Sequence, residues 1–338
     1  MFRPMCSEAS SDVFKVWLYA AASVLLGAWF APLLYNAGKA LAEVSSAKQL
    51  NSPIEWLAGI CRSADLPAFF EFSMILAAVI FFLPFIAWLR AGKNPESRLV
   101  GSLYLPEHVA EGQRMVANPR KLRQSVVGFF LVTGLFLIIG SVLVLSGVLS
   151  WKNPGGNFTK LIFQGLVVAL GWAVLQEILF RGIAMGIFLR AMRPSAALGM
   201  SAVFFAFVHF LKVPPGMNAI DPDAAGVGFE LLWKVAAQFA DGRRIAGTFI
   251  PLLALGIVFS DARWRTASLW LPIGLHAGWI FVSGLLAKVT TAAGHLDSTG
   301  WLISSTSLNQ GLVPLLGIIF AGVLANYYNH CDPCRRKQ

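Results

Sequence analysis

The chain has 338 residues, of which 57% are hydrophobic and only 13% are charged. Soluble domains carry about 25% charged residues, so this composition argues against a water-soluble globular protein. The net charge of +10 is not gathered in one basic module, as a nucleic-acid-binding domain would require. The basic residues lie in short segments between apolar stretches, which is typical of a multi-pass membrane protein. We therefore expect the lipid bilayer as a partner and no nucleic acid.

Runs of about twenty apolar residues predict membrane-spanning helices, and the chain contains eight candidates. They lie at 13–36, 66–89, 126–150, 161–190, 195–213, 246–260, 266–287 and 312–328. The predicted fold class is an all-α membrane protein, a polytopic bundle of about eight transmembrane helices. The sixth run is the shortest and ends at Asp261. The amphipathic stretch 226–240 is expected in the outer membrane interface.

The distribution of Lys and Arg predicts how the bundle is oriented. With the N-terminus inside, the inner segments hold sixteen Lys and Arg residues and the outer segments hold ten. The short inner connections at 190–194 and 261–265 are rich in arginine. Because basic residues favour the cytoplasmic side, we expect both termini in the cytoplasm and the protein in the cell (inner) membrane.

Four ionisable residues lie inside the later apolar runs: Glu177, Arg181, His209 and His276. Such groups cost several kcal/mol in a bilayer, so they usually face the protein interior and mark function. Glu177 and Arg181 are four residues apart and can pair on one helix face. At 1.5 Å per residue, Glu177, His209 and His276 lie about 20, 21 and 15 Å from the inner ends of their spans. This similar depth predicts one shared polar site.

The residue types at this depth suit hydrolysis. A carboxylate and an imidazole around one water form a general-base pair, and a second imidazole can donate to a developing oxyanion. Phe205 precedes His209 by one helical turn and can brace its ring. Small residues nearby, including Gly171, Gly186 and Gly199, are expected to let the helices approach closely. The pattern therefore favours cleavage of a peptide bond.

Three motifs carry a family resemblance: QEILFRG at 176–182, FAFVH at 205–209 and HAGWI at 276–280. They resemble the motifs Glu-Glu-x-x-x-Arg, Phe-x-x-x-His and His-x-x-x-Asn/Asp of the CAAX protease and bacteriocin-processing (CPBP) family of intramembrane glutamic peptidases. The resemblance covers roughly residues 160–290. It implies an intramembrane endopeptidase acting on a membrane-associated protein or peptide, and supporting roles for Arg181 and Phe205.

Two positions depart from the family motifs. The family's first Glu, taken as the water activator, is Gln176, and its final Asn or Asp, an oxyanion donor, is Ile280. Because an amide cannot act as a general base, we expect Glu177 to take that role with His209, supported by Gln176. His276 is then expected to stabilise the oxyanion. Losing one oxyanion donor typically costs about 10²–10³ in rate.

The resemblance also divides the chain. We expect an N-terminal transmembrane pair with a basic cytoplasmic connector at 1–125, a CPBP-like catalytic core at 126–330 and a basic cytoplasmic tail at 331–338. Cys331 and Cys334 have Cys-x-x-Cys spacing, but no second pair completes a zinc site. We interpret the segment as a basic tail.

The cofactor and the class of function have alternatives. Glu177, His209 and His276 are a possible His₂Glu zinc set, but the chain lacks the stronger His-Glu-x-x-His signal, so a mechanism without cofactor is favoured. A catalytically silent relative that binds a membrane partner stays open because of Gln176 and Ile280. A transporter or proton relay using the same intramembrane groups also stays open.

Overall fold

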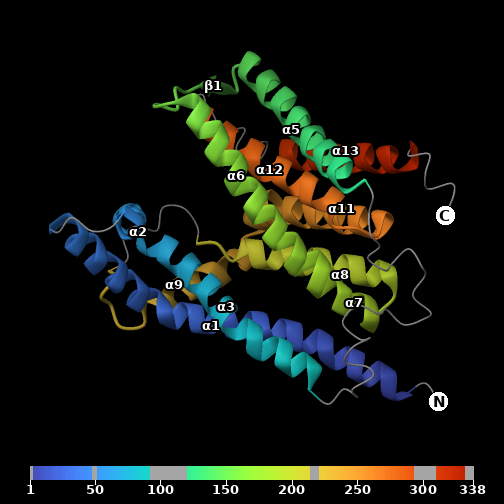
Figure 1. Ribbon diagram of the computed structural model, residues 1–338, viewed down its shortest axis with the longest axis horizontal. Helices are drawn as coiled ribbons and strands as arrows, with labels where there is room; N and C mark the ends of the chain where they lie inside the picture. Colours follow the sequence, from blue (N-terminus) through green and yellow to red (C-terminus); the bar gives the residue numbers. More distant parts are fainter. Residues whose placement is uncertain (1–2, 48–51, 92–119, 214–220, 293–309, 332–338) are drawn as a thin grey trace. The chain divides into compact units, whose positions relative to one another are not determined.

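The computed structural model describes residues 3–47, 52–91, 120–213, 221–292 and 310–331, and these are almost entirely helical (Figure 1). Seven of the described helices are long and apolar enough to cross a membrane, and Pro194–Phe210 is a shorter apolar helix. The predicted all-α, multi-pass membrane fold is confirmed. The chain forms two compact units, Met1–Asn94 with Leu211–Gly242, and Pro95–Phe210 with Arg243–Gln338.

The first unit is built on two long helices. Its elements are α1 (Arg3–Ala47), α2 (Ser52–Ser63), α3 (Leu66–Arg90), α9 (Val227–Ala237) and η3 (Gln238–Ala240). α1 and α3 pack along each other, and they touch at Gly27, where a Cβ atom would lie 2.6 Å from Met74 Cα. α9, the predicted amphipathic stretch, packs against α1, and its Gly228 abuts the Ala28 carbonyl.

The second unit contains the rest of the described chain. Its elements are α5 (Lys121–Leu145), β1 (Leu149–Trp151), α6 (Phe158–Glu177), η2 (Ile178–Ala184), α7 (Met185–Ala191), α8 (Pro194–Phe210), η4 (Ile245–Phe249), α11 (Ile250–Thr266), α12 (Trp270–Val289), β2 (Thr290–Ala292) and α13 (Leu312–Cys331). The chain passes from the first unit to the second within α10 (Gly242–Arg244). β1 and β2 form one antiparallel pair, with Ser150 opposite Thr291.

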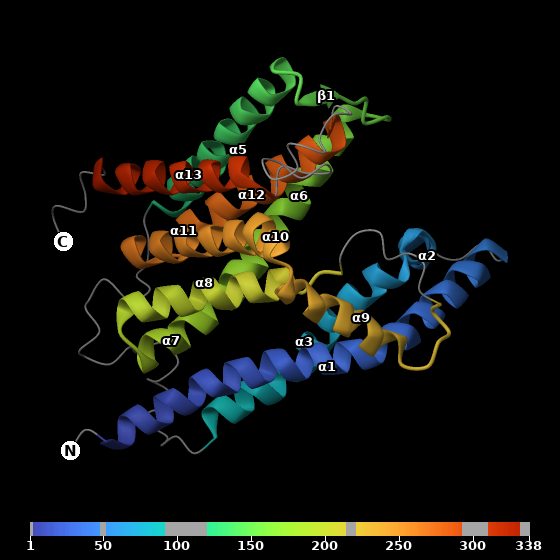
Figure 2. The same cartoon turned by 180° about the vertical axis from the view of Figure 1, so that it is seen from behind.

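α12 is the central helix of the second unit. It packs against α5, α6 and α11 (Figures 1 and 2). Every residue from 271 to 279 is buried, as expected for a core helix that is apolar on all sides. Glycines bring α5 and α12 together: a Cβ on Gly278 would lie 2.6 Å from Phe129 O, and one on Gly128 would lie 2.9 Å from Leu275 N. This packing fixes the position of His276.

All eight predicted spans correspond to helices, but some predicted boundaries are wrong. The third span was expected to reach residue 150, but α5 ends at Leu145 and β1 begins at Leu149. The sixth span was expected to end at Asp261, followed by a loop at 261–265, but α11 continues to Thr266 and α12 begins at Trp270. Arg265 Nε donates to Asp261 Oδ2 at 2.6 Å, an ion pair at helical i, i+4 spacing that stabilises this last turn. The charged residues end the apolar run without ending the helix.

Several predictions are not tested by the structure. Residues 92–119 of the predicted connector and the tail from 332 onward, including Cys334, lie outside the described residues. The orientation of the termini, the inner-membrane location, the interfacial position of 226–240 and the division of the chain at 125 and 330 stay predictions.

Candidate active site

α6 and the turn after it carry the two charged residues of the site. The buried residues of α6 are Ala169, Ala173 and Glu177, spaced by four, so they form one inward-facing stripe. Glu177 is the last residue of α6 and is fully buried. The chain then forms a π-helix, η2, which holds Arg181, also fully buried. Single π-turns within α-helices often occur at functional sites.

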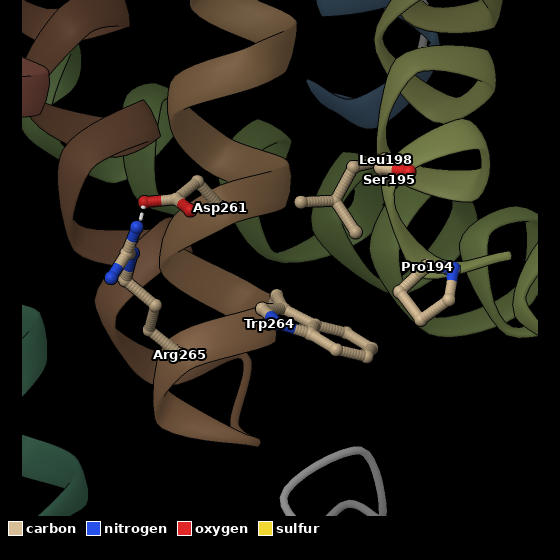
Figure 3. Close-up of a pocket in the computed structure, with 6 residues that line it drawn as sticks. All are labelled: Pro194, Ser195, Leu198, Asp261, Trp264 and Arg265. Atoms are coloured by element: carbon tan, nitrogen blue, oxygen red, sulfur yellow. Dashed lines mark hydrogen bonds and ion pairs between the residues drawn. The ribbon is translucent and has the colours of Figure 1, made fainter. Parts of the chain in front are cut away.

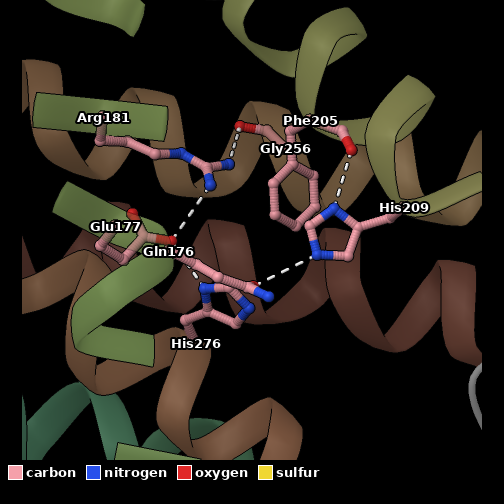
Figure 4. Close-up of polar contacts among 7 residues, drawn as sticks. All are labelled: Gln176, Glu177, Arg181, Phe205, His209, Gly256 and His276. Carbon is pink, nitrogen blue, oxygen red and sulfur yellow. Dashed lines mark hydrogen bonds and ion pairs between the residues drawn. The ribbon is translucent and has the colours of Figure 1, made fainter. Parts of the chain in front are cut away.

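Glu177, Arg181 and His276 form one buried cluster, here called the ionic group (Figure 4). Glu177 Oε1 accepts from Arg181 Nη1 at 3.1 Å and from His276 Nδ1 at 2.7 Å. Arg181 Nη2 donates to the Gly256 carbonyl of α11 at 3.2 Å. The ion pair is therefore also anchored to a third helix backbone, which compensates part of the cost of burying its charges.

His276 is held in one orientation by this cluster. Because a carboxylate oxygen only accepts, the Nδ1–H of His276 donates to Glu177, and Nε2 is the remaining ring nitrogen. The Phe259 ring lies 4.8 Å from the His276 ring, between centroids. Nε2 accepts a hydrogen bond when the ring is neutral and donates one when the ring carries two protons.

Gln176 and His209 form a second cluster, here called the amide–imidazole pair (Figure 4). His209 Nδ1 lies 2.9 Å from the Phe205 carbonyl, and Nε2 lies 3.2 Å from the Gln176 side-chain oxygen. Since the carbonyl only accepts, Nδ1 carries the proton, and a neutral ring presents its Nε2 lone pair to Gln176. The contact is then a hydrogen bond when the Gln176 amide turns its NH₂ group toward Nε2. Unlike the ionic group, both residues are partly exposed.

Phe205 joins the two clusters. Its ring centroid lies 4.0 Å from that of His209 and 5.8 Å from that of His276. The Arg181 guanidinium carbon lies 4.3 Å from the same centroid, a distance at which a cation and a ring attract each other. The structure thus brings together all the polar residues that the sequence singled out, and Phe205 holds them from α8.

The comparisons with known proteins agree with this geometry. Residues 158–282 match the family model described as type II CAAX prenyl endopeptidase Rce1-like. This segment is similar to the Rce1-like CAAX prenyl endopeptidases. The match runs from α6 into α12, contains every residue of both clusters and confirms the resemblance seen in the sequence. No curated protein and no solved structure matched the chain.

The Rce1-like segment departs from its family motifs in the way the sequence indicated. Ile280 follows His276 by one turn of α12, is partly buried and adds no polar side-chain group. Among the described residues, no three His, Cys, Asp or Glu side chains lie close enough to hold a metal ion. Glu177, His209 and His276 therefore do not converge as a zinc triad here, and the expected absence of a cofactor stays a prediction.

Two residues of α11 were missed by sequence reasoning. The Gly256 carbonyl receives Arg181, and Phe259 packs on the guanidinium at 5.1 Å from ring centroid to Cζ. Gly256 had a signal, since a glycine within an apolar helix often marks close backbone approach. A Cβ there would lie 2.9 Å from Ala202 Cα on α8. No sequence signal marked Phe259, because a phenylalanine in an apolar run is not distinguishable from the other apolar residues around it.

The expectation for the other glycines is wrong. A Cβ on Gly171, Gly186 or Gly199 would meet no atom within 4 Å among the described residues. These three glycines therefore do not mediate close helix approaches; around the site, Gly128, Gly256, Gly274 and Gly278 on α5, α11 and α12 do.

Proposed function

We propose that the protein is an intramembrane endopeptidase that hydrolyses a peptide bond of a membrane-associated protein. The observation that carries this proposal is the amide–imidazole pair. His209 is held through Nδ1 by the Phe205 carbonyl, so its Nε2 faces Gln176 at 3.2 Å as an oriented base. A general base must lie within hydrogen-bond reach of the proton that it abstracts.

In the proposed reaction, a water molecule replaces the direct contact between Gln176 and His209. It accepts from the Gln176 NH₂ group and donates to His209 Nε2. As its oxygen attacks the carbonyl carbon, one proton passes to His209. The imidazolium then returns this proton to the departing amine nitrogen, leaving a carboxylic acid and an amine. Gln176 orients the water and takes no proton.

The ionic group, which contacts the same Phe205 ring, supports this step. Glu177 fixes His276 at 2.7 Å, and a doubly protonated His276 donates from Nε2 to the oxyanion. In this arrangement Glu177 acts through His276. The sequence-based alternative makes Glu177 itself the base, through Oε2, which is buried and has no hydrogen-bond partner in the described part of the chain.

The family match suggests a first substrate class. A segment matching type II CAAX prenyl endopeptidases makes a prenylated C-terminal peptide the first substrate to test. The purified protein in nanodiscs is given farnesylated CaaX peptides in ¹⁸O-labelled water. We expect one ¹⁸O atom in the newly formed carboxylate, because water is the nucleophile.

Two variants decide which residue is the base. We expect His209→Ala to lower kcat by about 10²–10⁴ and Glu177→Gln to lower it less. A larger loss in Glu177→Gln than in His209→Ala would assign the base to Glu177. Products without ¹⁸O would contradict attack by water.

The second candidate function is that of a catalytically inactive relative of these peptidases, and one observation favours it. Gln176 occupies the position of the family's first Glu and contacts His209, so the pair holds an amide where the family motif has a carboxylate. If the wild type cleaves nothing and Gln176→Glu cleaves, the protein is a silenced peptidase whose remaining site is intact.

A further inference from the structure

A cavity of about 300 Å³ opens where the first turn of α8 lies beside the last turns of α11 (Figure 3). It is lined by Pro194, Ser195, Leu198, Asp261, Trp264 and Arg265. None of these residues belongs to the ionic group or the amide–imidazole pair. The cavity lies at the helix ends that the Lys and Arg distribution predicts to be cytoplasmic.

α11 connects this cavity to the ionic group. Trp264, Ser260 and Gly256 are spaced by four residues and share one helix face. Trp264 lines the cavity, and the Gly256 carbonyl accepts from Arg181. Between them, Ser260 is fully buried, and its hydroxyl has no hydrogen-bond partner among the described residues. A helical serine often donates to the carbonyl four residues earlier, which here is the Gly256 carbonyl that Arg181 already uses.

α8 carries a second buried hydroxyl that has no hydrogen-bond partner among the described residues. Ser201 follows Leu198 of the cavity by three residues and precedes Phe205 by four, so the three share a helix face. Ser201 is 1% exposed, and its hydroxyl also lacks a partner in the described chain. α8 and α11 pack together and touch where Gly256 meets Ala202. The two hydroxyls therefore line one seam, the interface between α8 and α11.

The series of unsatisfied polar atoms continues into the site. Arg181 Nε and Glu177 Oε2 are buried and have no hydrogen-bond partner within the described ranges. Buried polar groups are nearly always hydrogen-bonded, and internal water satisfies them where several lie close together. One such atom is an isolated exception, whereas two hydroxyls between the cavity and the ion pair, together with two atoms of the pair itself, indicate a hydrated path.

We propose that the seam between α8 and α11 carries water from the cavity to the ionic group, with Ser260 and Ser201 as its hydrogen-bonding positions. The hydroxyls, the guanidinium N–H and the carboxylate oxygen are all groups that water satisfies. The close contact of Gly256 with Ala202 leaves no room for a peptide between the helices. The purpose of the path rests on the proposed function, since each hydrolysed bond consumes one water molecule at the amide–imidazole pair, which shares the Phe205 ring with the ionic group.

Radiolytic hydroxyl-radical labelling tests this path, because X-ray pulses make radicals from the water molecules next to each side chain. The full-length protein in nanodiscs is irradiated, and oxidation is measured by mass spectrometry. Phe259, next to Ser260, and Phe188, on α7, are both 0% exposed, so they form a matched pair. We expect Phe259 to be oxidised several-fold faster than Phe188.

The double variant Ser201→Val and Ser260→Val should reduce the oxidation of Phe259 to the rate of Phe188, while oxidation of Trp264 in the cavity is unchanged. The control Ser283→Val alters a buried serine whose hydroxyl already donates to Ile280 O, and it should have no effect on Phe259. Equal oxidation of Phe259 and Phe188 in the wild type would overturn the proposal. So would fast oxidation of Phe259 that persists in the double variant, because water would then arrive by another route.

Peptide cleavage separates this proposal from the proposed function. In an active protein, the double variant should lower kcat several-fold and leave KM unchanged, because substrate contacts are not altered. A dry seam in an active peptidase overturns only the water path. A hydrated seam in a protein that cleaves no peptide overturns only the peptidase assignment.

Discussion

The ionic group and the amide–imidazole pair both contact Phe205, yet they differ in charge and in accessibility. Glu177, Arg181 and His276 are at most 2% exposed and are joined by ionic contacts. Gln176 and His209 are partly exposed and joined by one contact of 3.2 Å. In the proposed mechanism, the buried charges position other groups, while the more accessible pair acts on the substrate.

The largest expected effect tests the ionic group. Glu177→Ala leaves Arg181 as a buried charge without its carboxylate, which typically lowers the free energy of unfolding by about 3–5 kcal/mol. Thermal unfolding in detergent measures this loss. The double variant Glu177→Leu, Arg181→Met should recover most of it, because both charges are removed. A Glu177→Ala protein as stable as the wild type would contradict a positioning role.

The next effect tests the amide–imidazole pair. His209→Ala should lower kcat by about 10²–10⁴, the usual contribution of a general base, while the unfolding temperature changes little because His209 is partly exposed and lies outside the ion pair. The measurement is peptide cleavage alongside thermal unfolding. If the unfolding temperature and kcat fall together, the two clusters are one structural unit, and the proposed division between a structural and a catalytic cluster is wrong.

A change in the opposite direction is expected at Gln176. Gln176→Glu places a carboxylate beside His209, where it can accept a proton from water, so kcat should rise by about tenfold or more. Gln176→Ala, which removes the amide, is the matched control and should lower kcat. A rise in Gln176→Ala would show that the amide obstructs the site.

The smallest effect tests the backbone support of Arg181. Gly256→Ala should lower the free energy of unfolding by about 1–3 kcal/mol, because its Cβ would lie 2.9 Å from Ala202 Cα. Gly199→Ala, in the neighbouring helix with no atom within 4 Å, should be neutral or stabilise by up to about 1 kcal/mol. Equal unfolding temperatures for the two variants would show that α8 and α11 can separate without loss.

The spans and the polar residues could be predicted from the sequence because charged groups stand out against apolar runs. The pairing could not be predicted. Whether Glu177 contacts His276 or His209 depends on how far each helix is rotated, and the π-turn after Glu177 changes that rotation locally. The hydrogen bond from Arg181 to the Gly256 carbonyl could not be predicted either, because every residue has a backbone carbonyl and the sequence does not indicate which one Arg181 contacts.

The most direct test of the central claim compares protein termini in membranes that contain the wild type, His209→Ala or Gln176→Glu. Mass spectrometry identifies new C-terminal and N-terminal peptides in each membrane proteome. We expect at least one membrane-associated protein whose cleaved terminus appears with the wild type, disappears with His209→Ala and persists or increases with Gln176→Glu. Identical sets of termini for the wild type and His209→Ala would contradict a peptidase that uses His209 as its base.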